Sequence, residues 1–346
     1  MKPNVRGHLP PDDLRICVND SEKNLGSLEN ARILICGATG FVGTWLTSVL
    51  LEANSLLNLN LQISVISRDP IKASKILNVK VNDNLNIYKA DLIENIASII
   101  KNKSEYSHIV HAAVDSTRLD SNLDSNQQNL KVTKSILDFA HTLPKPPVLL
   151  HTSSGAVYGP QPLEMKQIQE LPFERIQFGE LTNYGRSKRE IEVMIQRATA
   201  KGTIKGSNPR LFTFMGPRIP MDKHYAAGNF LRDAMKGEPI LLNGNSKTTR
   251  SYLYPTDLVE WLIAVLASPL IDPIHIGSEI PIEMKKLAEV ISKTTSSCSL
   301  RLLGESIEPS NYVPSTYKTR MHYSLRERVA LHEGIRKWES WLQEIA

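Results

Sequence analysis

Three glycines at a fixed spacing follow the first strongly apolar segment of the chain. The segment 31–36 is typical of a buried strand, and Gly37, Gly40 and Gly43 lead directly into a helical pattern over 41–54. Glycines in such a turn let the backbone bend sharply and approach a pyrophosphate, which the N-terminus of the next helix stabilises. This context predicts a dinucleotide-binding turn, and with it a fold of alternating strands and helices.

Strand and helix patterns alternate after this turn. Short apolar runs separated by helical segments predict an α/β fold with a doubly wound parallel sheet, whose ligands bind beyond the carboxyl ends of the strands. The predicted strands are 31–36, 61–67, 85–88, 108–113, 147–151 and 210–214, and the predicted helices are 41–54, 94–101, 127–142, 181–198, 255–267, 284–293 and 335–345.

The same pattern divides the chain into three regions. Residues 1–28 are polar and are expected to form an N-terminal extension with a short helix around Asp12 to Val18. Residues 29–216 are expected to form the dinucleotide-binding domain. Residues 217–346 are less regular and are expected to form mainly a smaller substrate-binding region, interleaved with the last strands.

Charge and cysteine usage narrow the possible partners. The balance of 41 Lys and Arg against 36 Asp and Glu gives a net charge of +5, which does not indicate a nucleic-acid partner. Cys17, Cys36 and Cys298 have neither metal-ligand nor disulfide spacing. The N-terminus has no apolar core of a signal peptide, and the apolar stretch 261–270 is too short for a membrane span. We therefore expect a cytoplasmic protein with no membrane partner.

A second motif pairs a phenol with an ammonium group. Tyr184 and Lys188 lie four residues apart in a predicted helix and share one face of it. A nearby ammonium and the charge of a bound nicotinamide are expected to lower the phenol pKa from about 10, so that the phenol can exchange a proton with a carbonyl. Such pairs also occur as ordinary surface residues, but together with the glycine turn this one predicts an oxidoreductase.

Together the motifs resemble the short-chain dehydrogenases/reductases. The glycine spacing and Tyr184-x-x-x-Lys188 carry the resemblance, and His111-Ala-Ala113, Tyr158-Gly159 and Gly216-Pro217 narrow it to the extended branch. That branch contains the NAD(P)-dependent epimerases, dehydratases and reductases of nucleotide sugars. The resemblance covers about residues 30 to 300. It implies a Rossmann-type sheet with a smaller C-terminal substrate-binding region, and a nucleotide-diphosphate sugar as substrate.

The resemblance implies a catalytic group of Ser154, Tyr184 and Lys188. The segment Val157-Tyr158-Gly159 places Ser154 where relatives carry a catalytic Ser or Thr, and Ser153 has a lesser claim. The residues implied to bind the dinucleotide are Gly37, Thr39, Gly40, Phe41, Val42, Gly43, Ser67, Arg68, Asp91, Leu92, Ala112, Ala113, Asn129, Thr152, Ser153, Tyr184 and Lys188, and no metal is expected.

The end of the second strand bears on the choice of cofactor. Ser67 and Arg68 stand where an acidic residue would favour NAD, and a hydroxyl with a guanidinium can bind the 2′-phosphate of NADP. Alternatively, Arg68 stacks on adenine and Asp69 reaches the ribose. The sequence favours NADP(H) modestly over NAD(H).

The residues implied to bind the substrate are Ser154, Gly155, Thr213, Asn229 and Arg250. The segment 210–217 resembles the family pattern Arg-x-x-Asn-x-Tyr-Gly-Pro, with Thr213 in place of the asparagine. Arg250 is expected at the diphosphate, whose oxygens match a guanidinium fork, and Asn229 near it. Arg320 and His224 are weaker candidates.

Two small residues distinguish between reactions within the family. The 4,6-dehydratases and decarboxylases carry acidic residues after the catalytic hydroxyl, whereas this chain has Gly155 and Ala156, which cannot transfer a proton. We therefore expect a nucleotide 4-keto-(6-deoxy)sugar reductase using NADPH, or alternatively a 4-epimerase that keeps NAD bound. A dehydratase, a decarboxylase or a non-catalytic cofactor-binding protein is less favoured.

Assembly is predicted by resemblance alone. Extended members of the family dimerise through two helices, which correspond here to 127–142 and 181–198. A homodimer is the expectation.

Overall fold

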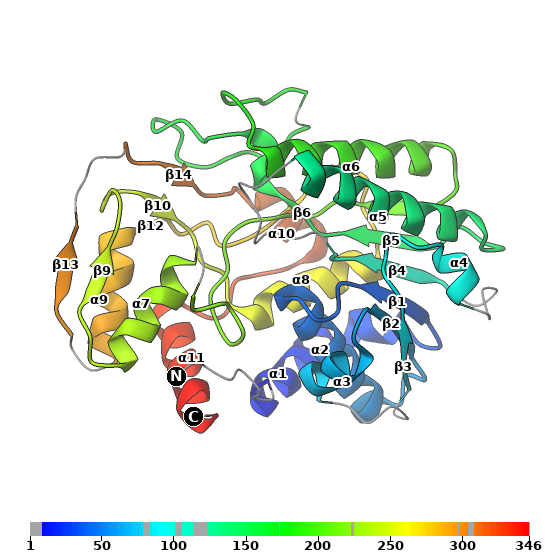
Figure 1. Cartoon of the computed structure of the whole chain (residues 1–346), viewed down its shortest axis with the longest axis horizontal. Coiled ribbons are helices and arrows are strands. Elements are labelled where there is room, and N and C mark those ends of the chain that lie inside the picture. Colours follow the sequence, from blue (N-terminus) through cyan, green and yellow to red (C-terminus); the bar gives the residue numbers. More distant parts are fainter. Residues whose placement is uncertain are drawn as a thin grey trace.

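A parallel sheet of six strands forms the centre of the structure (Figure 1). The computed structural model describes residues 9–78, 84–100, 106–113, 123–172, 174–222, 225–295, 298–303 and 308–345, excluding the side chains of 123–125. The strand order is β3-β2-β1-β4-β5-β7, and every neighbouring pair is parallel. The predicted doubly wound α/β fold is therefore confirmed. These strands are β1 (Arg32–Cys36), β2 (Gln62–Ser67), β3 (Leu85–Lys89), β4 (His108–His111), β5 (Val148–His151) and β7 (Lys205–Ser207).

The sixth strand of this sheet is not the one that the sequence predicts. The predicted strand 210–214 is reduced to β8 (Arg210–Leu211), which pairs with β6 (Ser153–Ser154) and β11 (His275–Ile276) in a separate small sheet. The edge of the central sheet is β7 instead. Pro209 lies between β7 and β8, and a proline cannot donate to a strand ladder, so the chain leaves the central sheet there.

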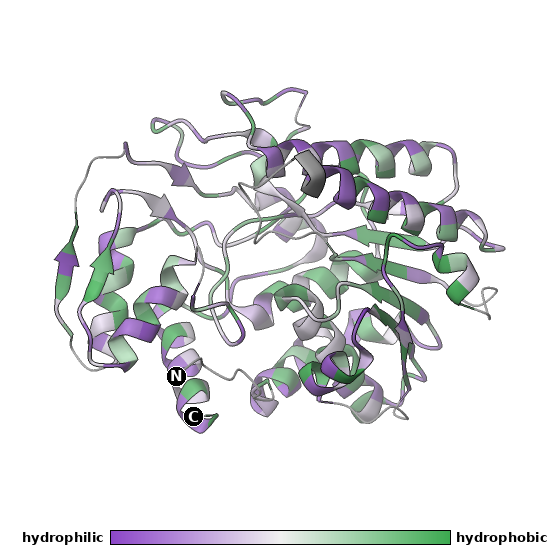
Figure 2. Cartoon of the chain, in the orientation of Figure 1, coloured by the Kyte–Doolittle hydropathy of each residue, from purple (hydrophilic) through white to green (hydrophobic). Residues whose placement is uncertain are grey.

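Helices cover both faces of the central sheet. The helices α5 (Leu123–His141) and α6 (Asn183–Ala200) lie side by side on one face, while α2 (Phe41–Leu57) and α8 (Pro255–Ala267) lie on the other (Figure 1). Figure 2 shows the apolar character of the strands and of α8, in which every residue from Pro255 to Leu266 is buried. The short helices on this half are α3 (Pro70–Leu77) and α4 (Ile96–Ile99).

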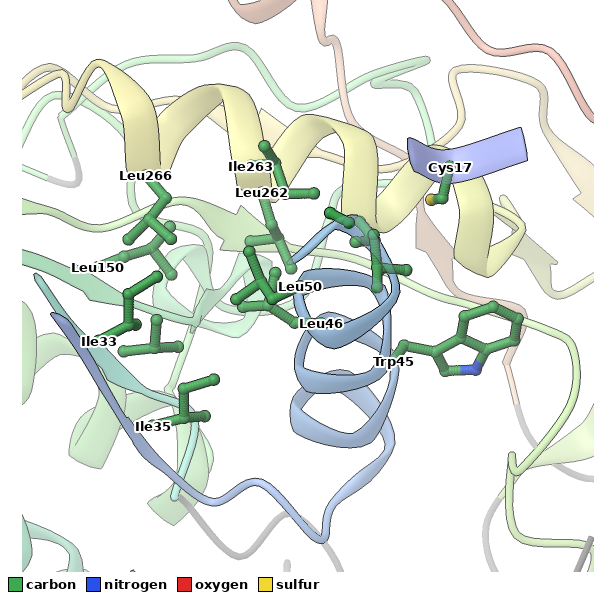
Figure 3. Close-up of a cluster of buried hydrophobic side chains, with 14 of the residues drawn as sticks. Cys17, Ile33, Ile35, Trp45, Leu46, Leu50, Leu150, Leu262, Ile263 and Leu266 are labelled. Carbon is green, nitrogen blue, oxygen red and sulfur yellow. The ribbon is translucent and has the colours of Figure 1, made fainter. Parts of the chain in front are cut away.

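The N-terminal helix belongs to the core. Instead of a short helix around Asp12 to Val18, α1 spans Pro11–Gly26 and packs against α2 and α8. Its buried side chains include Cys17, Val18 and Leu25, which join the cluster under the sheet (Figure 3). In that cluster Leu46 and Leu50 of α2 face Leu262, Ile263 and Leu266 of α8, with Ile33, Ile35 and Leu150 from the sheet.

The second half of the chain builds a smaller layer beside the sheet (Figure 1). A second cluster of buried side chains, including Trp338 and Trp341, holds its helices together. Trp45 Nε1 of α2 donates to the carbonyl of Pro217 at 3.0 Å, which joins the two parts. The elements are α7 (Ala226–Met235), α9 (Met284–Thr294), α11 (Leu331–Glu344), β9 (Ile240–Leu242), β10 (Thr249–Arg250), β12 (Ile282–Glu283), β13 (Leu300–Leu302) and β14 (Asn311–Tyr312), whereas α10 (Tyr317–Tyr323) contacts α8.

Across the described residues, no helix combines the length and the apolar character that a membrane crossing requires.

Candidate functional site

The glycine turn between β1 and α2 has the tight geometry that a dinucleotide site needs. Gly40 caps α2, and its N–H donates to the carbonyl of Gly37 at 3.1 Å. Gly37 has φ +93°, and a Cβ there would lie 2.5 Å from the backbone of Ala112. A Cβ on Gly43 would lie 2.1 Å from the Gly37 oxygen. No larger residue fits at these two positions, and the helix N-terminus is left open to an anion.

The turn after β2 presents the predicted adenosine-binding residues at the surface. Arg68 is exposed, and Ser67 Oγ accepts from the N–H of Asp69 at 3.2 Å. The Asp69 carboxylate accepts from the N–H of Lys72 at 3.0 Å and so caps α3. Asp69 is thus engaged with its own helix. Asp91 and Leu92 follow β3 and are half-buried.

A cavity of about 950 Å³ lies between the glycine turn and the second half of the chain. Both halves supply its walls, as expected for a site at the carboxyl ends of parallel strands. From the first half its lining includes Gly40, Phe41, Val42, Gly43, Ala112, Thr152, Ser153, Ser154, Ala156, Tyr184 and Lys188, and from the second half Phe212, Thr213, Phe214, Ile219, Tyr225, Asn229, Phe230, Arg232, Asp233, Arg250, Tyr252, Met284, Ser310 and Tyr312.

Ser154, Tyr184 and Lys188 all line this cavity. Ser154 ends β6 and caps a short 3-10 helix, where its Oγ accepts from the N–H of Ala156 at 3.2 Å. Thr182 caps α6 through the N–H of Gly185 at 3.1 Å, so Tyr184 and Lys188 stand in its first turns. Lys188 Nζ lies 5.7 Å from the centre of the Tyr184 ring.

Lys188 is buried, and its ammonium is directed at the backbone. Nζ donates to the carbonyl of Thr152 at 2.5 Å, and the residue is 2% exposed. Burial lowers the pKa of Lys188 to about 7, although Glu192 opposes this change. The side chain can therefore change its charge near neutral pH.

The protein's own groups do not lower the pKa of Tyr184, so this part of the prediction is wrong. Burial raises the pKa of Tyr184, and Tyr312 adds to this effect, while a hydrogen bond with Ser154 opposes it. The prediction counted on a fixed ammonium beside the phenol, whereas burial lowers the pKa of Lys188 itself. The phenol is therefore protonated at neutral pH and can serve as a proton donor. The effect of a bound nicotinamide on the Tyr184 pKa stays a prediction.

The neighbouring Ser153 and Asn129 point away from the reacting groups. Ser153 Oγ donates to Glu192 at 2.5 Å, and Glu192 is paired with buried Arg210 at 2.7 Å. Asn129 Nδ2 donates to Ser187 Oγ at 3.4 Å and thereby links α5 to α6. These contacts hold β6 and α6 in place beside the cavity.

Position 155 has no space for a side chain. A Cβ on Gly155 would lie 2.5 Å from the Phe212 ring and 2.8 Å from the Tyr312 hydroxyl. Two aromatic residues of the second half therefore fill the space in which a carboxylate at this position would have to lie.

Of the predicted substrate residues, Ser154, Thr213, Asn229 and Arg250 line the cavity. Arg250 Nη1 donates to the carbonyl of Ser310 at 2.9 Å, and Nη2 donates to Ser310 Oγ at 3.0 Å. Asn229 Oδ1 accepts from Arg232 at 3.2 Å, and Arg232 also pairs with Asp233 at 2.7 Å. Thr213 lines the cavity, whereas Gly155 is covered by the rings described above.

Other candidates lie elsewhere. Arg320 pairs with Glu279 at 2.7 Å, and His224 lies outside the described residues. Asp257, in the first turn of α8, accepts from the N–H groups of Arg328 and Val329, both at 3.1 Å.

Sequence reasoning missed Arg232, Phe212 and Tyr312. Phe212 stands in the segment 210–217, but at a position that the family pattern leaves unspecified, and neither Arg232 nor Tyr312 stands in one of the motifs on which the assignment of site residues rested. Arg232 follows Asn229 by one helical turn in α7, which was the one available signal. Tyr312 is separated from Ser154 by 158 residues, so only the fold brings them together.

Comparison with known proteins agrees with this geometry. Residues 33–276 match the NAD dependent epimerase/dehydratase family. The chain is 24% identical over 310 residues to UDP-glucuronic acid decarboxylase 1 of Arabidopsis thaliana, across 88% of this chain and 68% of that protein.

Solved structures share the fold. An epimerase from Methanothermobacter thermautotrophicus superposes with a TM-score of 0.78 at 18% identity, covering 94% of this chain and 96% of that one. The UDP-glucuronic acid 4-epimerase of Bacillus cereus, in complex with UDP-glucuronic acid and NAD, superposes with a TM-score of 0.74 at 19% identity, covering 91% and 100%.

Proposed function

Because this chain belongs to the NAD dependent epimerase/dehydratase family and is an enzyme, we propose that it reduces a nucleotide-activated 4-keto sugar with NADPH. Family membership supports an epimerase, dehydratase or decarboxylase type of activity on nucleotide sugars. One observation favours simple oxidoreduction within that range. The complete group of Ser154, Tyr184 and Lys188 lines the cavity, while Phe212 and Tyr312 fill the place of an acid or base at position 155.

The chain's own residues supply binding and proton transfer. The reduced nicotinamide, when bound, supplies the hydride. Ser154 donates a hydrogen bond to the ketone oxygen, and Tyr184 delivers the proton that this oxygen needs after reduction. Lys188, held by the Thr152 carbonyl, lies beside Tyr184 and can return a proton to it.

NADPH is supported by the turn after β2. Asp69 caps α3 through Oδ1, so in the alternative reading it would have to reach the ribose with its other carboxylate oxygen. The exposed guanidinium of Arg68 matches the doubly charged 2′-phosphate of NADP.

The lining of the cavity favours an uncharged sugar. Among the described residues, its cations are Lys188, Arg232 and Arg250. Arg232 is paired with Asp233, and Arg250 is bonded to Ser310 at the end expected to hold the diphosphate. A sugar carboxylate near Ser154 would lie against the rings of Phe212 and Tyr312, and Arg250, the cation beside Tyr312, is already bonded to Ser310. A neutral 6-deoxy sugar suits this wall.

A 4-epimerase is the second candidate. It would use the same three residues twice, with the keto sugar turning between the two hydride transfers. The similarity to solved 4-epimerases, one of which holds NAD, favours it.

Turnover of 4-keto-6-deoxy sugars carried on dTDP, UDP, GDP or CDP tests the proposal. We expect at least one of them to consume NADPH, at a rate well above that with NADH. Tyr184→Phe should keep its affinity for NADPH and lose 10²–10⁴-fold in kcat, because only the proton donor is removed. Tyr323→Phe, which removes a phenol bonded to the Ser268 carbonyl, is the control and should react normally. Unchanged turnover in Tyr184→Phe would contradict the assignment.

A further inference from the structure

A buried carboxylate lies one helical turn beyond Lys188. Lys188 and Glu192 are four residues apart in α6, and only 2% and 1% of them are exposed. Side chains at this spacing have Cβ atoms about 5–6 Å apart, so a lysine and a glutamate there can form an ion pair along the helix. In this structure the two groups have different partners. Lys188 Nζ donates to the carbonyl of Thr152 at 2.5 Å.

Arg210 holds both oxygens of the Glu192 carboxylate. Its Nε donates to Glu192 Oε1 at 3.0 Å, and its Nη2 donates to Oε2 at 2.7 Å. Ser153 Oγ, opposite Arg210 in the pairing of β6 with β8, also donates to Oε1. A guanidinium that binds a carboxylate through two bonds fixes the orientation of that carboxylate. Glu192 is therefore directed across to β6 and β8, rather than along its own helix to Lys188.

Arg210 is itself fixed from its other side. It is 1% exposed, and its Nη1 donates to Tyr158 Oη and, at 2.8 Å, to the carbonyl of Leu171. The guanidinium carbon lies 4.7 Å from the centre of the Tyr158 ring. Tyr158 Oη donates to the Leu171 carbonyl at 3.0 Å and lies 2.7 Å from His275 Nε2. The position of the guanidinium is thus set by groups on both sides of it.

Two neutral histidines also act on Lys188. His111 and His151, at the ends of β4 and β5, interact with it electrostatically. Burial lowers the pKa of His111 to about 3 and the pKa of His151 well below its usual value, so both are uncharged near pH 7. Tyr184 is protonated there as well. Among the described residues, Glu192 is therefore the neighbour that can place a negative charge beside Lys188.

We propose that Arg210 is a positioning residue, which binds Glu192 and so prevents it from pairing with Lys188. Lys188 then keeps its bond to the Thr152 carbonyl beside Tyr184. Because Tyr184 and Glu192 lie one turn from Lys188 in opposite directions along α6, a pair with Glu192 would draw Nζ away from Tyr184 and stabilise its charge. The return of a proton from Lys188 to Tyr184 rests on the proposed function, whereas the arrangement of the three charged residues does not.

The test measures the pKa of Lys188 without cofactor or substrate. The full-length protein is made with ¹³C at the lysine ε carbons and titrated with pH by NMR, and Lys188→Met identifies the Lys188 resonance. Arg210→Gln keeps an amide donor at this position but removes the charge. A free carboxylate about 6 Å away, at an effective dielectric constant of about 20, raises a lysine pKa by about two units. We therefore expect Arg210→Gln to raise the Lys188 pKa by at least about one unit.

Further variants separate the charge of Arg210 from its packing. Arg210→Lys loses the two-bond geometry but keeps a positive charge beside Glu192, so the Lys188 pKa should stay within about half a unit of the wild type. When Glu192→Gln is added to Arg210→Gln, the increase should disappear, because no carboxylate remains. Arg320→Gln, which breaks the ion pair with Glu279, is the control and should leave the Lys188 resonance unmoved.

Three results would overturn the proposal. The Lys188 pKa could be unchanged in Arg210→Gln, it could rise as much in Arg210→Lys, or its increase could persist after Glu192 is replaced.

The combined variant decides the question if Arg210→Gln alone does not fold, because it removes the buried pair as a whole. Its Lys188 pKa should lie less than about one unit below that of the wild type, since Arg210 already offsets the charge of Glu192. A larger fall would mean that Glu192 acts on Lys188 as a free carboxylate in the wild type, and would overturn the proposal.

This outcome is separate from that of the proposed function. If no 4-keto sugar is reduced but the Lys188 pKa responds as expected, the reaction is wrong and the role of Arg210 stands. If reduction occurs and the Lys188 pKa does not respond, the reaction stands and the role of Arg210 is wrong.

Discussion

Lys188 lies in the candidate site, and its burial makes the stability of the folded protein depend on pH. It is buried beside Tyr184, and burial lowers its pKa from 10.5 to about 7. Between these two values the unfolded chain holds a proton on this residue that the folded chain has lost. Because stability rises with pH wherever the unfolded state binds more protons, the contribution of Lys188 should become more favourable from about pH 7 toward pH 10.

Lys188→Met measures this contribution, since methionine fills similar space without a titrating group. Both proteins are unfolded with urea in the absence of cofactor. The free energy of unfolding of the wild type, relative to that of the variant, should increase by a few kcal/mol as the pH rises from about 7 to about 10. A difference that does not vary with pH would contradict the lowered pKa.

The site residues that the sequence predicted are those with a local signature. The glycine turn, Ser154, Tyr184 and Lys188 stand in short motifs whose spacing carries the chemistry, and the structure brings the three catalytic candidates to one cavity. Tyr312 has no such signature, because its position depends on the pairing of β14 with β10. The pKa of Tyr184 depends on burial, which a motif does not encode.

At the scale of elements, α1 departs most from the sequence prediction. Its polar composition suggested an extension, yet Cys17, Val18, Ser21 and Leu25 form a buried stripe at helical spacing. Asp13 of α1 accepts from Tyr254 Oη and from Lys337 Nζ, both at 2.7 Å, and so joins the two halves of the chain. By contrast, α8 agrees with the prediction at both ends, because it is mostly apolar and begins at a proline.

Two substitutions on α1 test its role in the core. Leu25→Ala should lower the free energy of unfolding by about 2–5 kcal/mol, because Leu25 is fully buried between α2 and α8. Ile16→Ala, on the same helix but 41% exposed, should change it by less than about 0.5 kcal/mol. Denaturant unfolding measures both changes in the free energy of unfolding. Equal effects of the two substitutions would mean that α1 does not contribute to the core.

At the scale of the whole molecule, the cavity requires both parts of the chain. The sheet supplies the glycine turn and the catalytic group, while the second half supplies Phe212, Arg250 and Tyr312. The boundary at residue 216 and the homodimer remain predictions. The outward positions of α5 and α6 include exposed Lys131, Lys134 and Glu190, so such a dimer would have a polar interface.

The most direct test of the proposed reaction follows the hydride itself. The enzyme is incubated with a nucleotide 4-keto-6-deoxy sugar and NADPH deuterated at either face of nicotinamide C4, and the sugar is analysed by mass spectrometry. We predict that one deuterium appears at C4 of the sugar with one of the two labelled cofactors, as NADPH is consumed in equal amount. A 4-keto sugar that is recovered without deuterium at C4, with no NADPH consumed, would contradict the reductase.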